Sequence, residues 1–153
     1  PEVVFININK FLPVEIGIAT IVSHEIRAFL DSFLYKNLTH PLILPMKSLG
    51  KRIRNHIKGL DILDYGLNLE RDAFIINSNS TTLGWPLSAA YALAICTQAN
   101  AKRINLIGFD GYDSSDLRYE EMNNVIYKYQ KLKNAVEIVS LTPTRYDIKE
   151  LLF

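Results

Sequence analysis

The stretch AFIINSNSTTLGWPLSAAYALAICTQANAKRINLIG, residues 73–108, decides the fold class. Its first residues, 73–77, form an apolar run that predicts a buried strand. Residues 87–100 are alanine-rich and apolar on nearly every side, which predicts a helix lying close against a sheet. Residues 103–108 predict another strand. A strand, a helix and a strand in this order are typical of parallel strands joined by a crossover helix.

The rest of the sequence continues this alternation in both directions. Short apolar runs predict further strands, and amphipathic runs predict helices. Strands alternating with helices indicate an α/β domain with a mostly parallel sheet covered on both faces. The further predicted strands are residues 3–8, 16–22, 42–44, 61–67 and 136–141. The predicted helices follow caps at Ser23, at Ser48 and at Ser115 or Asp116, and Thr142-Pro143-Thr144 predicts a short terminal helix.

The composition is that of one packed domain spanning residues 1–153. Hydrophobic residues make up 48% and charged residues 22%, so a core of ordinary size can form. The formal net charge of +1 gives no electrostatic reason to expect DNA, RNA or an anionic membrane as a partner. No apolar run is long enough for a membrane span, and no signal peptide is visible. We therefore expect a cytoplasmic domain.

Two features of the sequence concern the cellular compartment of the domain and the longer chain to which we expect it to belong. Its one cysteine, Cys96, excludes an internal disulfide and lies in the apolar helical run, so we expect a buried thiol in a reducing compartment. The sequence enters a predicted strand almost directly after Pro1. Such a start is typical of a domain excised from a longer chain, so we expect a covalent N-terminal partner domain.

The polar run inside the opening stretch is the first candidate site. Amide or hydroxyl side chains fill every position from Asn77 to Thr82, between a predicted strand and a predicted helix. Free N–H groups at a helix N-terminus, together with the helix dipole, bind anions such as phosphate. The same residue types favour turns, so a long cap and turn is the alternative. The expected anion-binding residues are Asn77, Asn79, Ser80, Thr81, Thr82 and Gly84.

The second candidate is the acidic segment after residues 103–108. In open parallel sheets, ligands bind beyond the carboxyl ends of the strands, which is where Asp110 lies. An acid at this place can accept hydrogen bonds from ribose or sugar hydroxyls, or hold a metal through water. Turn and cap chemistry alone is enough to explain Asp113 and Asp116. Asp110 is therefore the expected binding residue of the three.

The remaining titratable residues favour structural roles. His24 follows a predicted strand and has the chemistry of a general base, but such a residue is more often part of a first helical turn. His40 and His56 have no visible partners, and the spacings of a zinc site are absent, so no metal is expected. The cations between Lys47 and Lys58 wrap around a predicted helix. A solvated face explains them, and the alternative is a phosphate-bearing ligand or an acidic partner surface.

Residues 82–112 resemble a superfamily of Rossmann-like domains that includes bacterial surface-oligosaccharide sialyltransferases and archaeal hydroxymethylpterin diphosphokinase. The shared pattern is a small polar turn, an alanine-rich helix and Ile-x-Leu-x-Gly-x-Asp-x-Tyr, which is met at residues 104–112. The resemblance implies a Rossmann-like three-layer sandwich that binds the nucleotide part of a donor. The implied pocket residues are Asn7, Asn9, Ser80, Thr81, Asp110 and Tyr112.

This sequence departs from the sialyltransferase pattern in one respect. Their catalytic histidine follows the Asp-x-Tyr motif, whereas all three histidines of this chain precede it, so no catalytic residue is assigned. Related domains also look to be appended to pyruvate- or acyl-CoA-type aldolase barrels in polysaccharide gene clusters.

Three hypotheses follow. The first is a domain of a surface-polysaccharide biosynthesis enzyme, a transferase by resemblance, that binds a small phosphorylated ligand or nucleotide-sugar and needs no further cofactor. The second is a non-catalytic accessory domain of an aldolase or other lyase. The third is a protein-interaction module that uses the basic helix.

Overall fold

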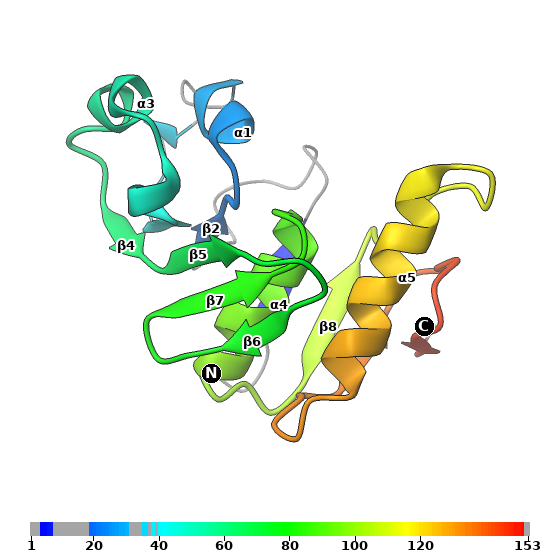
Figure 1. The fold of residues 1–153 in the computed structure, drawn as a ribbon. Coiled ribbons are helices and arrows are strands. Elements are labelled where there is room, and N and C mark those ends of the chain that lie inside the picture. The colour runs from blue at the N-terminus through cyan, green and yellow to red at the C-terminus, as the bar shows by residue number, and fades with distance from the viewer. Residues whose placement is uncertain (1–3, 8–18, 31–34, 37, 39, 152–153) are drawn as a thin grey trace. The chain divides into compact units, whose positions relative to one another are not determined.

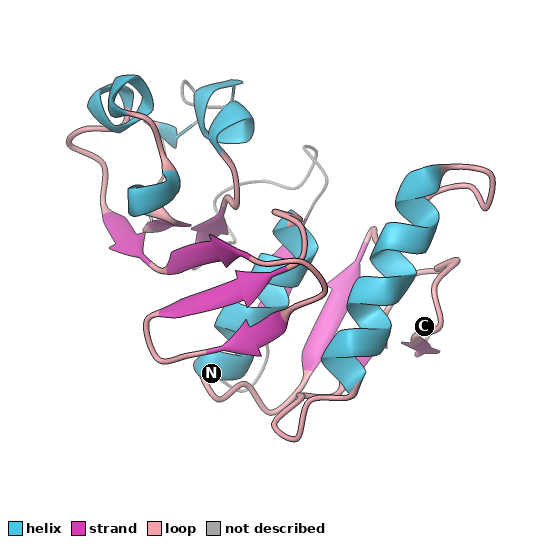
Figure 2. Ribbon diagram, viewed as in Figure 1, coloured by secondary structure: helices cyan, strands magenta, loops and turns pink. Residues whose placement is uncertain are grey.

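A computed structural model describes residues 4–7, 19–30, 35, 36, 38 and 40–151 (Figure 1). These residues form a mixed α/β structure whose strands belong to three small sheets (Figure 2). The chain divides into two compact units. Unit 1 combines residues 1–12 with residues 92–153, and unit 2 is residues 13–91.

The sheet of unit 1 is parallel throughout its described strands. Its strand order is β1-β8-β9-β10, and β8 pairs with β1 on one side and with β9 on the other. The strands predicted at residues 3–8, 103–108 and 136–141 correspond to β1, β8 and β9, and these three strands pair in parallel. Because the strands run in the same direction, the loops that follow β8 and β9 leave the same edge of the sheet. The strands are β1 (Val4–Asn7), β8 (Ile104–Ile107), β9 (Ile138–Ser140) and β10 (Lys149–Glu150).

The predicted terminal helix is wrong, because the chain after β9 forms a loop and then the strand β10. The threonines of this loop bond to the loop after β8 instead of capping a helix. The Thr142 hydroxyl accepts a hydrogen bond from the Gly108 N–H at 2.9 Å, and the Thr144 hydroxyl donates to the Phe109 carbonyl at 2.7 Å.

The helix α5 (Leu117–Gln130) follows the sequence prediction closely. Asp116 is its N-cap and accepts a hydrogen bond from the Arg118 N–H at 2.9 Å. Its buried residues recur at helical spacing, as expected for a helix with one apolar face. They are Met122, Val125, Ile126 and Tyr129.

The helix α4 (Ser88–Gln98) is buried on nearly every side, as its alanine-rich sequence predicts. Residues 89–94 are all buried. Cys96 is 1% exposed, which confirms the predicted buried thiol. In the part of the chain that the structure describes, no helix has both the length and the apolar character needed to cross a membrane.

A buried pair of hydroxyls joins α4 to α5. The Thr97 hydroxyl donates to the Leu93 carbonyl at 2.8 Å and lies 2.7 Å from the Tyr129 hydroxyl. The Tyr129 hydroxyl also accepts a hydrogen bond from the Val136 N–H at 2.9 Å, and this bond fixes the chain that leads into β9. Because Tyr129 is fully buried, water cannot replace these bonds.

In unit 2, β2, β3 and β4 form a parallel sheet in that order, and an apolar cluster packs beside it. The cluster contains Leu49, Ile53 and Ile57, which recur at every fourth position before, within and after α3. The elements are β2 (Thr20–Ile21), α1 (Glu25–Leu30), β3 (Leu42–Leu44), the 3-10 helix η2 (Met46–Ser48), α3 (Lys51–His56) and β4 (Ile62–Asp64).

The caps expected at Ser23 and Ser48 are wrong. Ser23 is buried, and its hydroxyl donates to the Pro86 carbonyl at 2.8 Å. Ser48 lies in η2, and its hydroxyl donates to the Leu67 carbonyl at 2.9 Å. The N-cap of α3 is Gly50, whose N–H donates to the Glu25 carboxylate at 3.0 Å. Both serines bond to residues distant in sequence, which a local capping pattern does not predict.

The third sheet differs most from the prediction. Its order is β5-β7-β6, with β5 parallel and β6 antiparallel to β7. The strand expected to be buried at residues 73–77 is an edge strand, in which Ile75 is 48% exposed. Residues 61–67, expected as one strand, divide between β4 and β5 because the chain passes from one sheet to the next. The strands are β5 (Gly66–Leu69), β6 (Phe74–Ile76) and β7 (Ser80–Leu83).

Replacing Tyr129 with phenylalanine should destabilise the protein. The change removes the acceptor of the Val136 N–H and the hydroxyl contact with Thr97, so we expect the free energy of unfolding to fall by about 1–3 kcal/mol. Urea denaturation followed by circular dichroism measures it. The matched control is Tyr127→Phe on the same helix, where the ring is 60% exposed; it should change stability by less than about 0.5 kcal/mol. Equal effects of the two substitutions would contradict the role of the hydroxyl pair.

The Cys96 thiol should be inert in the folded protein. Burial raises the pKa of Cys96 to about 12, so almost no thiolate exists near neutral pH. We expect a disulfide reagent at about pH 8 to leave the native protein unmodified and to label Cys96 fully in denaturant. Rapid labelling under native conditions would show that α4 is not packed as described.

Candidate functional site

Two loops meet at the carboxyl edge of the unit 1 sheet, residues 108–116 after β8 and residues 141–148 after β9. We call them the β8–β9 rim. Besides the two threonine hydrogen bonds, the Arg145 N–H donates to the Asp110 carbonyl at 2.9 Å. These bonds fix the backbone on both sides of Asp110. The rim is therefore held in one arrangement before any ligand arrives, which lowers the entropic cost of binding.

Three aromatic rings pack against one another and support the rim. The Phe109 ring packs 5.1 Å from the Tyr146 ring, and Tyr119 stacks on Tyr146 from the helix α5 at 5.8 Å. The Tyr146 hydroxyl accepts a hydrogen bond from the Tyr112 N–H at 3.2 Å. Gly111 has φ of +91°, and a Cβ there would come within 3.2 Å of the Tyr146 ring, so this position requires glycine. Burial raises the pKa of Tyr146, which keeps its hydroxyl protonated.

The outer surface of the rim presents a carboxylate, an aromatic ring and a guanidinium group. Asp110 is exposed, and within the described ranges its carboxylate has no hydrogen bond or ion pair. Tyr112 is 37% exposed. The Arg118 guanidinium lies 4.2 Å from the centre of the Tyr112 ring, a cation–π contact that orients both groups.

The other two acidic residues have the structural roles that turn and cap chemistry predicts. Asp113 accepts hydrogen bonds from the Ser115 N–H and hydroxyl and pairs with Arg145 at 3.0 Å, and these contacts lower its pKa. Hydrogen bonds from Arg118 lower the pKa of Asp116 to about 2. Among the described residues, no group of three histidine, cysteine or acidic side chains is arranged to hold a metal ion.

The predicted anion loop occupies a different place in the fold from the one expected. Residues 77–79 turn between β6 and β7, and Ser80, Thr81 and Thr82 belong to β7 itself. The strand β7 thus contains half of the polar run and separates residues 77–79 from the N-terminus of α4. The expected position directly before a helix is wrong, because the threonines extend as a strand, for which β-branched residues are suited.

Several polar groups of residues 77–82 are already hydrogen-bonded to the protein. Thr81 is fully buried, and its hydroxyl donates to the Ile75 carbonyl at 2.7 Å. The Tyr65 hydroxyl lies 3.0 Å from the Asn77 carbonyl and 2.9 Å from the Ser80 carbonyl. The side chains of Asn77 and Asn79 are exposed at the turn.

The other predicted pocket residues are placed separately. Asn7 ends β1 and lies in register with Ile107, and Asn9 is outside the described residues. Asn77 to Gly84 belong to unit 2, whereas Asp110 and Tyr112 belong to unit 1. Asp110 and Tyr112 thus lie on the same rim of unit 1. A pocket that they share with the Asn77–Gly84 segment stays a prediction.

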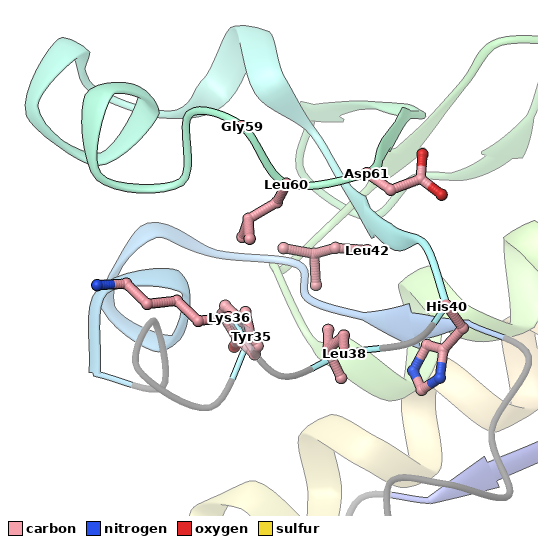
Figure 3. Close-up of a pocket in the computed structure, with 8 residues that line it drawn as sticks. All are labelled: Tyr35, Lys36, Leu38, His40, Leu42, Gly59, Leu60 and Asp61. Carbon is pink, nitrogen blue, oxygen red and sulfur yellow. The ribbon is translucent and has the colours of Figure 1, made fainter.

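A small cavity in unit 2 was not predicted from the sequence. It has a volume of about 240 Å³ and is lined by the eight residues shown in Figure 3. Leu38, Leu42 and Leu60 point toward one another, whereas the carboxylate of Asp61 points away from them. The His40 Nε2 lies 2.8 Å from the Thr20 hydroxyl, and its buried Nδ1 has no hydrogen-bond partner among the described residues. The lining residues come from separate segments, so no spacing pattern in the sequence indicates the cavity.

Comparison with known proteins identifies no relative. No protein-family model, curated protein or solved structure matches the chain. The functional argument therefore depends on the chemistry of the residues themselves.

Lowering the pH should destabilise the protein partly through Asp116. Because its pKa is lowered in the folded state, its stabilising contribution is complete above about pH 4 and is lost as the pH falls toward about 2. Asp116→Asn keeps an N-cap side chain but cannot titrate. We expect its melting temperature to fall less than that of the wild type over this pH range, measured by differential scanning calorimetry. Parallel curves for the two proteins would contradict the assignment.

Proposed function

We propose that the β8–β9 rim binds a nucleotide or a sugar phosphate. The observation that carries the proposal is the exposed Asp110 carboxylate, which has no partner among the residues that the structure describes, at the carboxyl edge of a parallel sheet and two residues from the exposed Tyr112. This edge is where open parallel sheets bind ligands. A carboxylate without a protein partner is free to accept hydrogen bonds from the hydroxyls of a sugar.

Each exposed group of the rim matches one part of such a ligand. Asp110 accepts from ribose or sugar hydroxyls, and the part of the Tyr112 ring that Arg118 leaves exposed offers a surface for stacking a base. Arg118 and Arg145 are half-exposed cations, each held by one carboxylate. A guanidinium oriented in this way has remaining N–H donors for phosphate oxygens.

The same proposal includes the fold family of the domain and the class of enzyme to which it belongs. We infer a Rossmann-like three-layer sandwich, and a place in the superfamily whose Ile-x-Leu-x-Gly-x-Asp-x-Tyr pattern spans β8 and the rim at residues 104–112. The corresponding role is that of a nucleotide- or sugar-phosphate-binding domain in a surface-polysaccharide biosynthesis enzyme of the transferase class, working in the cytoplasm. The parallel order β1-β8-β9 supports the fold assignment. An accessory domain of an aldolase or lyase is the second candidate, with the same rim left unused.

A thermal-shift panel of nucleotides, nucleotide-sugars and sugar phosphates tests the proposal. A ligand that binds only the folded state stabilises it by about 2.7 kcal/mol at a concentration about 100 times its Kd. We expect at least one compound to raise the melting temperature, and Asp110→Asn to abolish the increase, because the variant loses the charged acceptor.

Glu70→Gln is the matched control, since Glu70 is an exposed acid in unit 2 and the change in charge is the same. It should keep the full increase in melting temperature. An undiminished shift in Asp110→Asn would place the ligand elsewhere. If no phosphate compound stabilises the wild type, the accessory role is favoured.

A further inference from the structure

The helix α3 and its flanks present a strongly basic surface in unit 2. Between residues 46 and 60 the sequence contains five cations and no acid. Within the described part of the chain, none of the five forms an ion pair or a side-chain hydrogen bond. All five are exposed. We call the exposed surface around α3 and its flanks the basic face, and its cations are Lys47, Lys51, Arg52, Arg54 and Lys58.

The concentration of charge is unusual for a chain that is nearly neutral. The other 12 Lys and Arg residues and all 16 Asp and Glu residues lie outside residues 46–60. Two of these carboxylates reach the flanks of α3, where Glu25 accepts a hydrogen bond from the Gly50 N–H and Asp64 accepts one from the Met46 N–H. Lys51, Arg52 and Arg54 lie on α3, Lys47 lies in η2 and Lys58 follows α3, so five like charges repel one another within a short stretch of the chain. An anionic partner would relieve this repulsion, so the basic face is suited to one.

The basic face also has an aromatic group at its edge. Phe29 of α1 is 40% exposed, and the Arg52 guanidinium lies 5.5 Å from the centre of its ring. The His56 ring lies 5.8 Å from the Phe29 ring. Arginine and aromatic side chains dominate the binding energy of protein–protein interfaces, where polar groups surround an apolar centre.

We propose that the basic face binds an acidic protein segment that carries an apolar side chain. Its carboxylates pair with the cations of α3, and the apolar side chain covers the exposed part of Phe29. Nucleic acid fits less well, because single strands bind to a series of stacking rings, and Phe29 already contacts Arg52 and His56. The site lies in unit 2 and is independent of the β8–β9 rim in unit 1.

Fluorescence anisotropy with labelled peptides tests the proposal. The probe is a peptide of alternating glutamate and glycine with one central leucine, and the reference peptide has serine in place of the leucine. We expect Arg52→Glu combined with Arg54→Glu to weaken binding of the leucine peptide by about tenfold or more at low salt. Phe29→Ala should weaken the leucine peptide and leave the serine peptide unchanged, which simple charge attraction would not produce.

The control pair is Lys131→Glu with Lys133→Glu, two exposed lysines of unit 1 whose reversal changes the net charge equally. This variant should bind the leucine peptide as the wild type does, and circular dichroism verifies that each variant is folded. Equal weakening by both pairs would overturn the proposal in favour of general charge attraction. Absence of peptide binding, or preferential binding of an oligouridine RNA, would overturn it as well.

Discussion

The parallel pairing of β8 with β1 and β9 is the constraint on which the rest of unit 1 depends. β8 is buried, with Ile104, Asn105 and Leu106 each less than 5% exposed, so its backbone groups must find partners in neighbouring strands. Parallel pairing satisfies them and at the same time directs the loops after β8 and β9 to one edge. The contacts between the two loops of the β8–β9 rim, from the threonine hydrogen bonds to the packing of Phe109 on Tyr146, require the loops to be neighbours there.

The polar side chains of this protein fall into two groups. Several polar side chains bond to the protein itself, as Thr81, Thr142 and Asp116 do. A second group has no such bond among the described residues, and Asp110 and the basic face belong to it. The distinction matters because a group already bonded to the protein must exchange that bond for one to a ligand, with little net gain in free energy.

The sequence predicts the elements of unit 1 better than those of unit 2. The helix α5 has an N-cap at Asp116 and regular apolar spacing, so both its start and its buried face follow from local pattern. The run at residues 73–77 is different, because a short apolar strand looks the same in sequence whether it is central or at an edge. Its partner β7 consists largely of hydroxyl residues that are also typical of a loop. The pairing of the two strands, which a local pattern does not encode, decides between these structures.

For the candidate site, the sequence by itself determined that Asp110 follows a buried strand and that Asp113 and Asp116 have turn and cap chemistry. These properties depend on residues adjacent in the chain. Only the tertiary structure decided that Tyr146 supports the loop of Asp110, that Phe29 lies beside Arg52, and that the polar run after residue 77 enters a strand. Each of these depends on contacts between segments distant in sequence, because buried polar groups bond to whichever partner the packing of strands and helices brings within reach.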